Sequence, residues 1–332
     1  MNISELAEKL NLHASTVSRA LNRPESVAEA TRQRVIIAAQ TYGYRPNGLA
    51  RSLRTRQTST LGLIVSDIRN PFYASLAKAI EDVARKNDFS VIISNANEDP
   101  RQEENALRLL EEKQVSAIIH CSTGANLEIL RAMQERGVLI LDLDRASGLD
   151  DVDQVLVNNR LGAALAARHL LELGHTRLAT IAGPLHLTPG RERLEGFRLA
   201  LEEAGLALPW ELIEVGDFRE ASGYAATQRL LGLAQPPSAL FVANNEMLAG
   251  ALAALRDQGV RVPRDLSLVS FDDARWAQYT DPPLTVIAQP IDAMGTLAAK
   301  LLLRRLRDAN APSHHVLDPH LIIRASTRSL TP

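Results

Sequence analysis

The sequence contains very little cysteine and few aromatic residues. Cys121 is the only cysteine among 332 residues, so no intrachain disulfide can form. Its place in the apolar run 117–121 predicts a buried structural thiol. Apolar residues make up 45% of the chain and aromatic residues only 4%, which favours a globular protein rich in helix. The length is sufficient for two or three domains.

Long hydrophobic runs and targeting signals are also missing. No apolar run approaches the roughly 20 residues that a membrane span requires, and the N-terminus has no charged segment followed by an apolar one. We therefore expect a cytoplasmic protein with no membrane partner. The sequence ends at Pro332 without a heptad repeat, which argues against a leucine-zipper tetramer.

Signatures of catalysis and of cofactor binding are not found. There is no nucleophile elbow, Walker loop, glycine pattern for dinucleotides or His/Cys cluster with metal-ligand spacing. The pair His314-His315 is predicted to be solvated in a polar loop, and the pair Asp272-Asp273 has no identifiable partner acid. The sequence therefore predicts no enzymatic activity, no cofactor and no metal.

The charge is distributed unevenly although the net charge is only −2. Residues 1–57 hold nine Lys/Arg and four Asp/Glu, or +5, whereas the other 275 residues hold 28 and 35, or −7. A basic head on an acidic body suggests that the head contacts a polyanion, because neutralised phosphates release counterions. A small basic domain without such a partner is the alternative that charge alone leaves open.

Residues 11–22 read as the turn and second helix of a helix-turn-helix. Apolar residues with helical spacing flank the turn: Leu6, Ala7, Leu10, Val17, Ala20 and Leu21. Asn11 occupies the turn, where a left-handed residue is often needed and Asn is tolerated. Ser4 is expected to cap a first helix over 5–10, and a third helix over 29–42 is stopped by Gly43 and Pro46.

The outer face of the second helix has a composition suited to a DNA major groove. It consists of small or hydrogen-bonding groups with one long cation: Ala14, Ser15, Thr16, Ser18 and Arg19. A helical hairpin with a solvated polar face fits these residues equally well. The basic stretch 47–58 that follows is too short to hold a helix alone, and we expect a linker that becomes helical only on docking. A flexible tether is the alternative.

From Leu61 onward, strands alternate with helices in two series. The expected strands are 61–65, 90–94, 117–120, 139–143, 178–182, 213–215, 239–242 and 266–270, and the expected helices are 73–87, 102–113, 127–136, 160–173, 191–204, 221–233 and 246–258. This predicts an α/β body of two doubly wound lobes with parallel sheets. Ligands of such sheets bind beyond the carboxyl ends of the strands, so we expect a cleft between the lobes.

Polar and aromatic residues follow the predicted strands where that cleft would lie. They are Asn70, Phe72, Tyr73, Asp144, Arg145, Arg193, Phe218, Asn244, Asp272 and Gln289. Sugar rings stack on aromatic side chains, and sugar hydroxyls need both carboxylates and cations as partners. Taken singly, Asp and Asn after a strand are more often helix caps.

Seven ordered motifs make the chain resemble the lactose/galactose-repressor (LacI/GalR) family over essentially its whole length. They occupy residues 16–19, 44–47, 50–53, 67–72, 144–145, 270–273 and 284–289. Two departures are Asn11 in place of the usual turn glycine and Ala14 where many relatives carry a larger base-reading residue. The resemblance implies a DNA-binding headpiece (1–46), a hinge helix (47–58) and an effector-binding and dimerisation body (59–332). The first lobe would comprise about 59–158 and 290–317, and the second 159–289 and 318–332.

The resemblance also implies a function. The chain would be a sequence-specific DNA-binding transcriptional regulator, a repressor, acting as a homodimer on near-palindromic double-stranded operator DNA. Leu53 would enter the minor groove at a central base step. Further DNA contacts implied in this way are Ser4, Asn22, Tyr44, Asn47, Ala50, Arg51 and Arg54.

The polar set after the strands looks like the sugar site of the periplasmic ribose-binding protein, with Tyr73 replacing a Phe. This implies ribose, or another pentose or hexose, as the effector. Arg145 and Arg193 leave room for a sugar acid, and the same positions serve purines in some relatives, whereas Asp144 and Asp272 argue against a doubly charged phosphate. A sugar-binding module of transport type is the other class of function, disfavoured by the basic headpiece.

Overall fold

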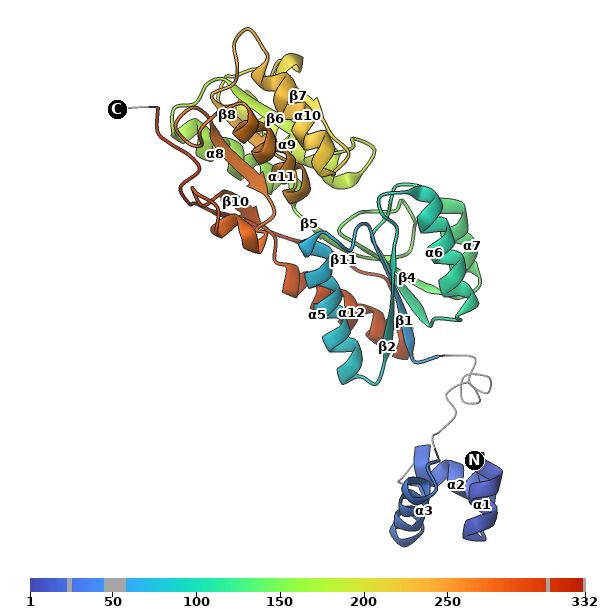
Figure 1. The fold of residues 1–332 in the computed structure, drawn as a ribbon. Coiled ribbons are helices and arrows are strands. Elements are labelled where there is room, and N and C mark those ends of the chain that lie inside the picture. Colours follow the sequence, from blue (N-terminus) through green and yellow to red (C-terminus); the bar gives the residue numbers. More distant parts are fainter. Residues whose placement is uncertain (23–25, 45–57, 309–310, 331–332) are drawn as a thin grey trace. The chain divides into compact units, whose positions relative to one another are not determined.

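The computed structural model describes residues 1–22, 26–44, 58–308 and 311–330. The chain divides into two compact units, Met1–Thr58 and Ser59–Pro332, which we call the headpiece and the body and describe separately (Figure 1). None of the described helices is long and apolar enough to cross a membrane.

The described part of the headpiece packs short helices around a small apolar core. The helices are α1 (Ile3–Leu10), α2 (Ala14–Asn22) and α3 (Glu29–Thr41). The buried core residues are Leu6, Ala7, Val17, Ala20, Val35 and Ala38. Asn11 ends α1 with a φ of 52° and a ψ of 46°, which confirms the left-handed turn residue.

The first helix begins earlier than predicted, because Asn2 and not Ser4 is its N-cap. The Asn2 side chain accepts a hydrogen bond from the Glu5 amide at 3.0 Å, and the Glu5 carboxylate accepts one from the Asn2 amide at 3.0 Å. This reciprocal arrangement is a capping box. Ser4 therefore lies inside the first turn, and the prediction that it caps the helix is wrong.

The first lobe of the body is built on a parallel sheet with the strand order β11-β5-β4-β3-β1-β2. Its strands are β1 (Thr60–Val65), β2 (Ser90–Asn95), β3 (Ala117–His120), β4 (Leu139–Leu143), β5 (Asp153–Val157) and β11 (His314–Leu317). One face is covered by α5 (Pro71–Lys86) and α12 (Ile291–Arg307), and the other by α6 (Pro100–Glu112) and α7 (Leu127–Glu135) (Figure 1). Burial on both faces explains the nearly continuous apolar strands.

The second lobe has a similar sheet, with the order β12-β10-β9-β8-β6-β7. Its strands are β6 (Leu178–Ala182), β7 (Ile213–Val215), β8 (Ala239–Val242), β9 (Ser267–Phe271), β10 (Thr285–Ala288) and β12 (His320–Ile322), and β12 runs antiparallel to β10. The helices α8 (Asn159–Glu172) and α9 (Thr188–Glu203) cover one face, and α10 (Glu220–Leu231) and α11 (Asn245–Asp257) cover the other. Short 3-10 turns lie at Trp210–Leu212 and Arg275–Gln278.

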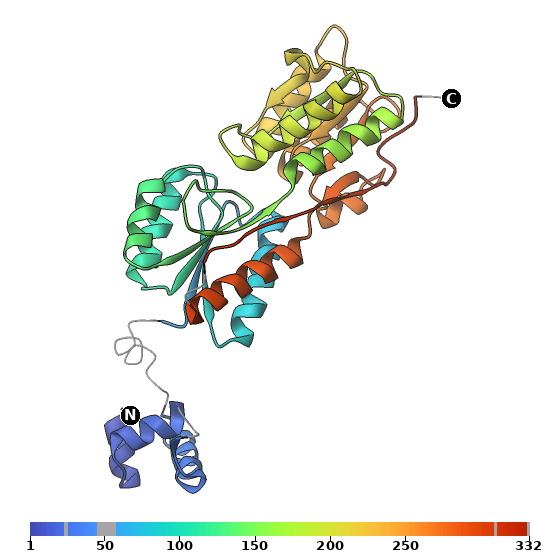
Figure 2. The same ribbon diagram turned by 180° about the vertical axis from the view of Figure 1, so that it is seen from behind.

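The chain passes between the lobes at several points. It crosses between β5 and α8, returns between β10 and α12, and crosses again between β11 and β12 (Figure 2). As a result α12 and β11 belong to the first lobe, whereas β12 belongs to the second. Each crossing leaves or enters a strand, so the carboxyl ends of both sheets meet at the same place.

The alternation of parallel strands and helices is confirmed, but the strands after residue 150 and the last helix were not all predicted. The missing elements are β5, β10, α12, β11 and β12. The sequence analysis placed the pair His314-His315 in a polar loop, and this prediction is wrong. Both residues lie in the edge strand β11, where they pair with Gln154 and Val155 of β5. Cys121 is fully buried, which confirms a structural thiol.

Candidate functional site

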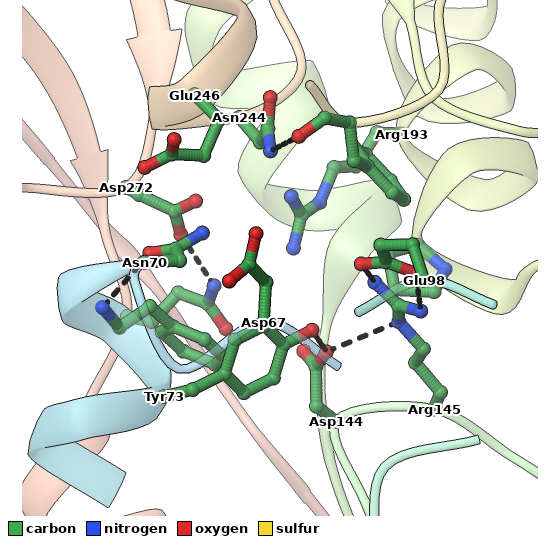
Figure 3. Close-up of a pocket in the computed structure, with 14 residues that line it drawn as sticks. Asp67, Asn70, Tyr73, Glu98, Asp144, Arg145, Arg193, Asn244, Glu246 and Asp272 are labelled. Carbon is green, nitrogen blue, oxygen red and sulfur yellow. Dashed lines mark hydrogen bonds and ion pairs between the residues drawn. The ribbon is translucent and has the colours of Figure 1, made fainter. Parts of the chain in front are cut away.

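A pocket lies between the two lobes at the carboxyl ends of their strands (Figure 3). All ten predicted residues line it, together with Asp67, Glu98, Pro189 and Glu246. The cavity left between these side chains is small, with a volume of about 20 Å³. The side chains therefore fill most of the space between the lobes.

The first lobe places two aromatic rings in the pocket through the start of α5. Asn70 caps this helix by accepting a hydrogen bond from the Phe72 amide at 2.9 Å, and Pro71 occupies its first turn. The rings of Phe72 and Tyr73 meet edge to face with their centroids 4.9 Å apart, and both are buried. Asn244 in the second lobe likewise caps α11. The two asparagines are thus caps and pocket residues at once.

Three pocket residues have left-handed backbone conformations. The φ angles are 68° at Asp144, 64° at Phe218 and 77° at Asp272. Asp144 and Asp272 directly follow β4 and β9, so the turn of the backbone aims each carboxylate back across the end of its sheet. Such conformations are uncommon outside glycine, are more frequent for Asp, and concentrate at ligand sites.

Arg145 is held by a buried ion pair with Glu98. Its guanidinium donates to both Glu98 carboxylate oxygens at 2.6 and 2.7 Å and to the Ser122 carbonyl at 3.2 Å. It also lies 5.4 Å from the centroid of the Phe218 ring. Burial opposes its charge, but Tyr73, Glu98 and Asp144 outweigh burial and raise the pKa of Arg145 well above its ordinary value. This cation is already neutralised by the protein.

Arg193 approaches the pocket from α9 of the second lobe. It donates to the Asn159 side chain at 2.8 Å and to the Ala243 carbonyl at 2.6 Å, and it stacks on Phe271 with its Cζ 3.6 Å from the ring centroid. Burial lowers the pKa of Arg193, although nearby carboxylates partly counteract it. Its guanidinium points into the space among the labelled carboxylates (Figure 3).

Two buried carboxylates have polar neighbours but keep unused hydrogen-bonding capacity. Tyr73 donates its hydroxyl to Asp144 at 3.2 Å, and Gln289 donates its amide to Asp272 at 2.6 Å. Asp144 Oδ1, Arg145 Nε and Gln289 Oε1 are buried and have no hydrogen-bond partner among the described residues. Burial, opposed in part by Arg145, raises the pKa of Asp144, and burial opposed by Arg193 raises the pKa of Asp272. Such orphaned donors and acceptors suit a ligand with many hydroxyls.

Direct hydrogen bonds join the lobes beside the pocket. Asn70 and Asn245 exchange two amide hydrogen bonds at 2.9 and 3.0 Å, and both side chains are buried. Arg219 of the second lobe donates to the Asn97 carbonyl of the first at 2.7 Å. These contacts fix the width of the pocket.

Sequence reasoning missed four lining residues, three of them acidic. Asp67 follows β1 and Glu98 lies after β2, so the rule used for the other strand ends would have found them. Glu246 lies in the first turn of α11, where an acidic residue usually only complements the helix dipole, and it gave no separate signal. With them, the lining has five carboxylates against two guanidinium groups.

The headpiece presents the predicted DNA-contacting face of α2 with one qualification. Ser15 and Arg19 are exposed, and Arg19 donates to the Ser15 carbonyl at 3.2 Å, within the same helix. Thr16 and Ser18 are half-buried. Ala14 is half-buried and packs against the headpiece core, so it is not fully on the outer face as predicted.

The remaining predicted DNA contacts differ in their surroundings. Ser4 is exposed, whereas Tyr44 is half-buried against the core, where burial raises its pKa. The other predicted DNA contacts lie outside the part of the chain that the structure describes. They are the side chain of Asn22 and residues Asn47, Ala50, Arg51, Leu53 and Arg54.

Sequence comparisons bear on both parts of the chain. Residues 2–47 match the family described as "Bacterial regulatory proteins, lacI family", and residues 167–327 match a "Periplasmic binding protein-like domain". The ribose operon repressor of Escherichia coli is 33% identical over 326 residues, covering 98% of this chain and 99% of that protein. The HTH-type transcriptional repressor PurR of Klebsiella pneumoniae is 33% identical over 328 residues, covering 98% of this chain and 96% of that protein.

Solved structures agree with the sequence relatives. A lac repressor dimer bound to operator and the anti-inducer ONPF matches with a TM-score of 0.85 and 27% identity, covering 99% of both chains. A ribose operon repressor described as putative, from Burkholderia thailandensis, matches with a TM-score of 0.74 and 32% identity, covering 80% of this chain and 98% of that one. The transcriptional regulator CelR in complex with cellobiose matches with a TM-score of 0.76 and 32% identity, covering 98% and 99%.

Proposed function

Because the chain belongs to the lacI family of bacterial regulatory proteins, we propose that it is a repressor whose operator affinity is controlled by a small uncharged sugar. As a member of this family it is a DNA-binding transcriptional regulator and not an enzyme. The sugar binds in the pocket between the lobes, and the cytoplasm is the place where such a regulator meets its operator.

The charge of the pocket carries the argument for an uncharged ligand. Five carboxylates line it, and Arg145, one of its two cations, is committed to Glu98 at 2.6 and 2.7 Å. Asp67 is likewise paired with Arg69 at 2.7 Å, so among the described lining residues Asp144, Glu246 and Asp272 remain, with Arg193 as the other cation. An anionic ligand would face these carboxylates in a poorly solvated space, where repulsion between like charges is strong. A sugar acid or a sugar phosphate is therefore disfavoured, and the room that Arg145 seemed to leave for an acid is taken by Glu98.

Ribose is the first candidate among uncharged sugars. The aromatic residues Phe72 and Phe218 can cover ring faces, while Asp144, Gln289 and Arg145 offer the orphaned polar atoms that hydroxyls can satisfy. A relative at 33% identity is named a ribose operon repressor. Another relative at similar identity is the HTH-type transcriptional repressor PurR, and a purine is the alternative effector.

On the DNA side, we propose that α2 enters the major groove with Arg19 as its base-reading residue. Arg19 is the only side chain on the exposed face of the helix able to fork onto a guanine. A homodimer joined through the body would place two headpieces on a near-palindromic site, because one headpiece alone buries too little surface for tight specific binding. Residues 47–58 would form the hinge.

A thermal-shift screen of the full chain tests the effector. D-ribose at about 100 times its Kd should stabilise the body by about 2.7 kcal/mol and raise its Tm by several degrees. Ribose 5-phosphate carries the same sugar with an added phosphate charge and should give no shift, and neither should the sugar acid gluconate. A shift with hypoxanthine and none with any sugar would replace the sugar proposal with the purine alternative.

A salt series tests the DNA function separately. Binding to random duplex DNA should weaken steeply as salt rises from about 50 to 200 mM, because phosphate contacts release counterions. A transport-type sugar-binding module would show no binding at any salt concentration.

A further inference from the structure

A second group of buried titratable side chains lies outside the pocket lining. Glu103 of α6, His120 at the end of β3 and Asp142 of β4 are each fully buried. They lie on the side of the first sheet that α6 and α7 cover, where the neighbouring core is otherwise apolar. In the described part of the chain, no group of His, Cys, Asp or Glu has the arrangement of a metal site.

The histidine lies between the two carboxylates with unequal contacts. His120 Nε2 is 2.8 Å from Glu103 Oε1, which is a short hydrogen bond. His120 Nδ1 is 4.0 Å from Asp142 Oδ1, and neither of these two atoms has a hydrogen-bond partner among the described residues. The register of the sheet pairs His120 with Asp142 on one side and with Ile64 on the other.

The hydrogen bonds of Glu103 determine which nitrogen of His120 carries a proton. Its carboxylate accepts from the Thr123 amide at 2.8 Å, the Thr123 hydroxyl at 2.6 Å and the Asn126 amide at 2.6 Å. A carboxylate with so many donors is an ionised acceptor, so His120 Nε2 must donate to it. If His120 is neutral, its Nδ1 then presents a lone pair to Asp142. A proton bound to either atom would make this 4.0 Å contact electrostatically favourable, although it is longer than a hydrogen bond.

Each carboxylate holds one of the loops that shape the pocket. Glu103 binds the loop 121–126, whose Ser122 carbonyl accepts from Arg145 at 3.2 Å. Asp142 accepts from the Ser147 amide at 2.8 Å and its hydroxyl at 3.0 Å, and so holds the loop that carries Asp144 and Arg145. The loop 121–126 also reaches the second lobe, because Gly124 lies against His186 and Leu187.

We propose that Glu103, His120 and Asp142 form a positioning cluster, in which a proton bound by either His120 or Asp142 couples the two pocket loops and supports effector binding. The proposal rests on the proposed function, since it concerns the same pocket. Burial raises the pKa of Asp142, which agrees with a proton held at this carboxylate. The titratable groups facing the histidine are Glu103 from α6 and Asp142 from β4. The uncharged Thr123 and Asn126 contact Glu103, and Gln154 of β5 donates to Asp142 at 3.3 Å.

Amide hydrogen exchange of the full-length chain tests the cluster without any ligand. The variant His120→Gln cannot hold the extra proton and should speed exchange of the Thr123 and Ser147 amides about tenfold beyond the effect of global stability. The matched control is His175→Gln, a buried histidine of the second lobe that hydrogen-bonds Ser238 and Ser267. It should leave both amides unchanged. Equal protection in His120→Gln and the wild type would overturn the proposal.

Affinity for D-ribose across pH 6 to 9 tests the proton itself. Wild-type affinity should fall as the pH rises and the cluster loses its proton, and His120→Gln should bind about tenfold more weakly at pH 6 with a flat profile. The variant Asp142→Asn places a permanent N–H toward His120 Nδ1 and should bind tightly at every pH.

Parallel pH profiles for the wild type and Asp142→Asn would contradict the proposed role of this proton. A water that donates to both His120 Nδ1 and Asp142 Oδ1 would then explain the contact without an additional proton. If D-ribose binds none of these proteins, the ribose assignment fails, and the exchange measurement still decides whether the cluster couples the loops.

Discussion

The headpiece exposes the side chains assigned to its function, whereas the body buries them. Ser15 and Arg19 lie at the surface of α2, where Ser15 contacts His13 in the preceding turn and Arg19 donates to the Ser15 carbonyl. In the pocket, Asp144, Arg145 and Asp272 are at most 6% exposed, and each is tied to other side chains. A surface residue can be changed without disturbing the fold, but a buried charge carries a desolvation cost that its partners or a ligand must offset. Binding and stability should therefore be separable in the headpiece and coupled in the body.

The largest expected effect is on sugar affinity in Asp272→Asn. Asn tolerates the φ of 77° at this position, so the backbone should be preserved. The change weakens the acceptor for the Gln289 amide and removes a negative charge near Arg193, at roughly 1–3 kcal/mol for each group left without a partner. We expect calorimetry to show D-ribose affinity reduced at least about a hundredfold, with operator binding in the absence of sugar unchanged. Unchanged ribose affinity would place the site elsewhere.

The next effect is on operator affinity in Arg19→Ala. Loss of a base-reading arginine should cost on the order of 1–3 kcal/mol at the operator and much less on random DNA. The headpiece should keep its melting temperature, because Arg19 is exposed. Arg32→Ala removes the same charge from α3 and serves as the control, with similar losses on both DNAs. Equal losses on both DNAs for Arg19→Ala as well would make Arg19 a phosphate contact.

A change in the capping box of α1 should have a smaller effect, and here stability and DNA binding of the headpiece should change together. Asn2→Ala removes the acceptor for the Glu5 amide and should destabilise α1 by about 1 kcal/mol. The core of the headpiece is small, so this loss should lower its melting temperature and weaken operator and random DNA together. Glu5→Gln keeps a hydrogen-bonding group at the same place and should have less effect. A loss confined to the operator would instead make Asn2 a base contact.

The two regions also differ in how far the sequence could predict them. Most of the pocket residues were found because they lie near the end of a strand, and parallel strands bring their carboxyl ends to one edge. Arg193 instead lies within α9. Ala14 was predicted on the outer face of α2 but is half-buried against the headpiece core. Helical spacing alone does not determine how deeply a small residue at the edge of the apolar face is buried. The partners of Arg145 were also missed, since the Glu98 ion pair joins residues 47 positions apart.

The late elements were missed for a topological reason. Residues 285–322 cross between the lobes twice, and β10, β11 and β12 are short strands. β11 pairs with β5, which is about 160 residues earlier, and β12 pairs with β10 across the whole of α12 and β11. Their pairing partners supply most of the order, and local periodicity over three or four residues cannot show it. The pair His314-His315 looked like a polar loop because edge strands carry polar residues.

The smallest expected effect is a gain in stability, from Asp144→Asn. Burial raises the pKa of Asp144, so the folded protein holds this proton more tightly than the unfolded chain does. The free energy of unfolding therefore decreases as the pH rises from the pKa of Asp144 in the unfolded chain through its raised pKa in the folded protein. Above that pH, the ionised carboxylate destabilises the folded protein. Asparagine keeps an acceptor for the Tyr73 hydroxyl without the charge, and Arg145 keeps Glu98 as its partner.

We therefore expect Asp144→Asn to have a higher melting temperature than the wild type at pH 8, with a free energy of unfolding larger by about 1 kcal/mol or less. The difference from the wild type should be smaller at pH 5. The same variant should bind D-ribose more weakly, because an orphaned acceptor has become a donor. Melting curves at the two pH values check the first result and calorimetry the second. If Asp144→Asn is instead destabilised relative to the wild type, and more so at pH 8 than at pH 5, the ionised Asp144 stabilises Arg145. The buried carboxylate would then contribute to stability as well as to binding.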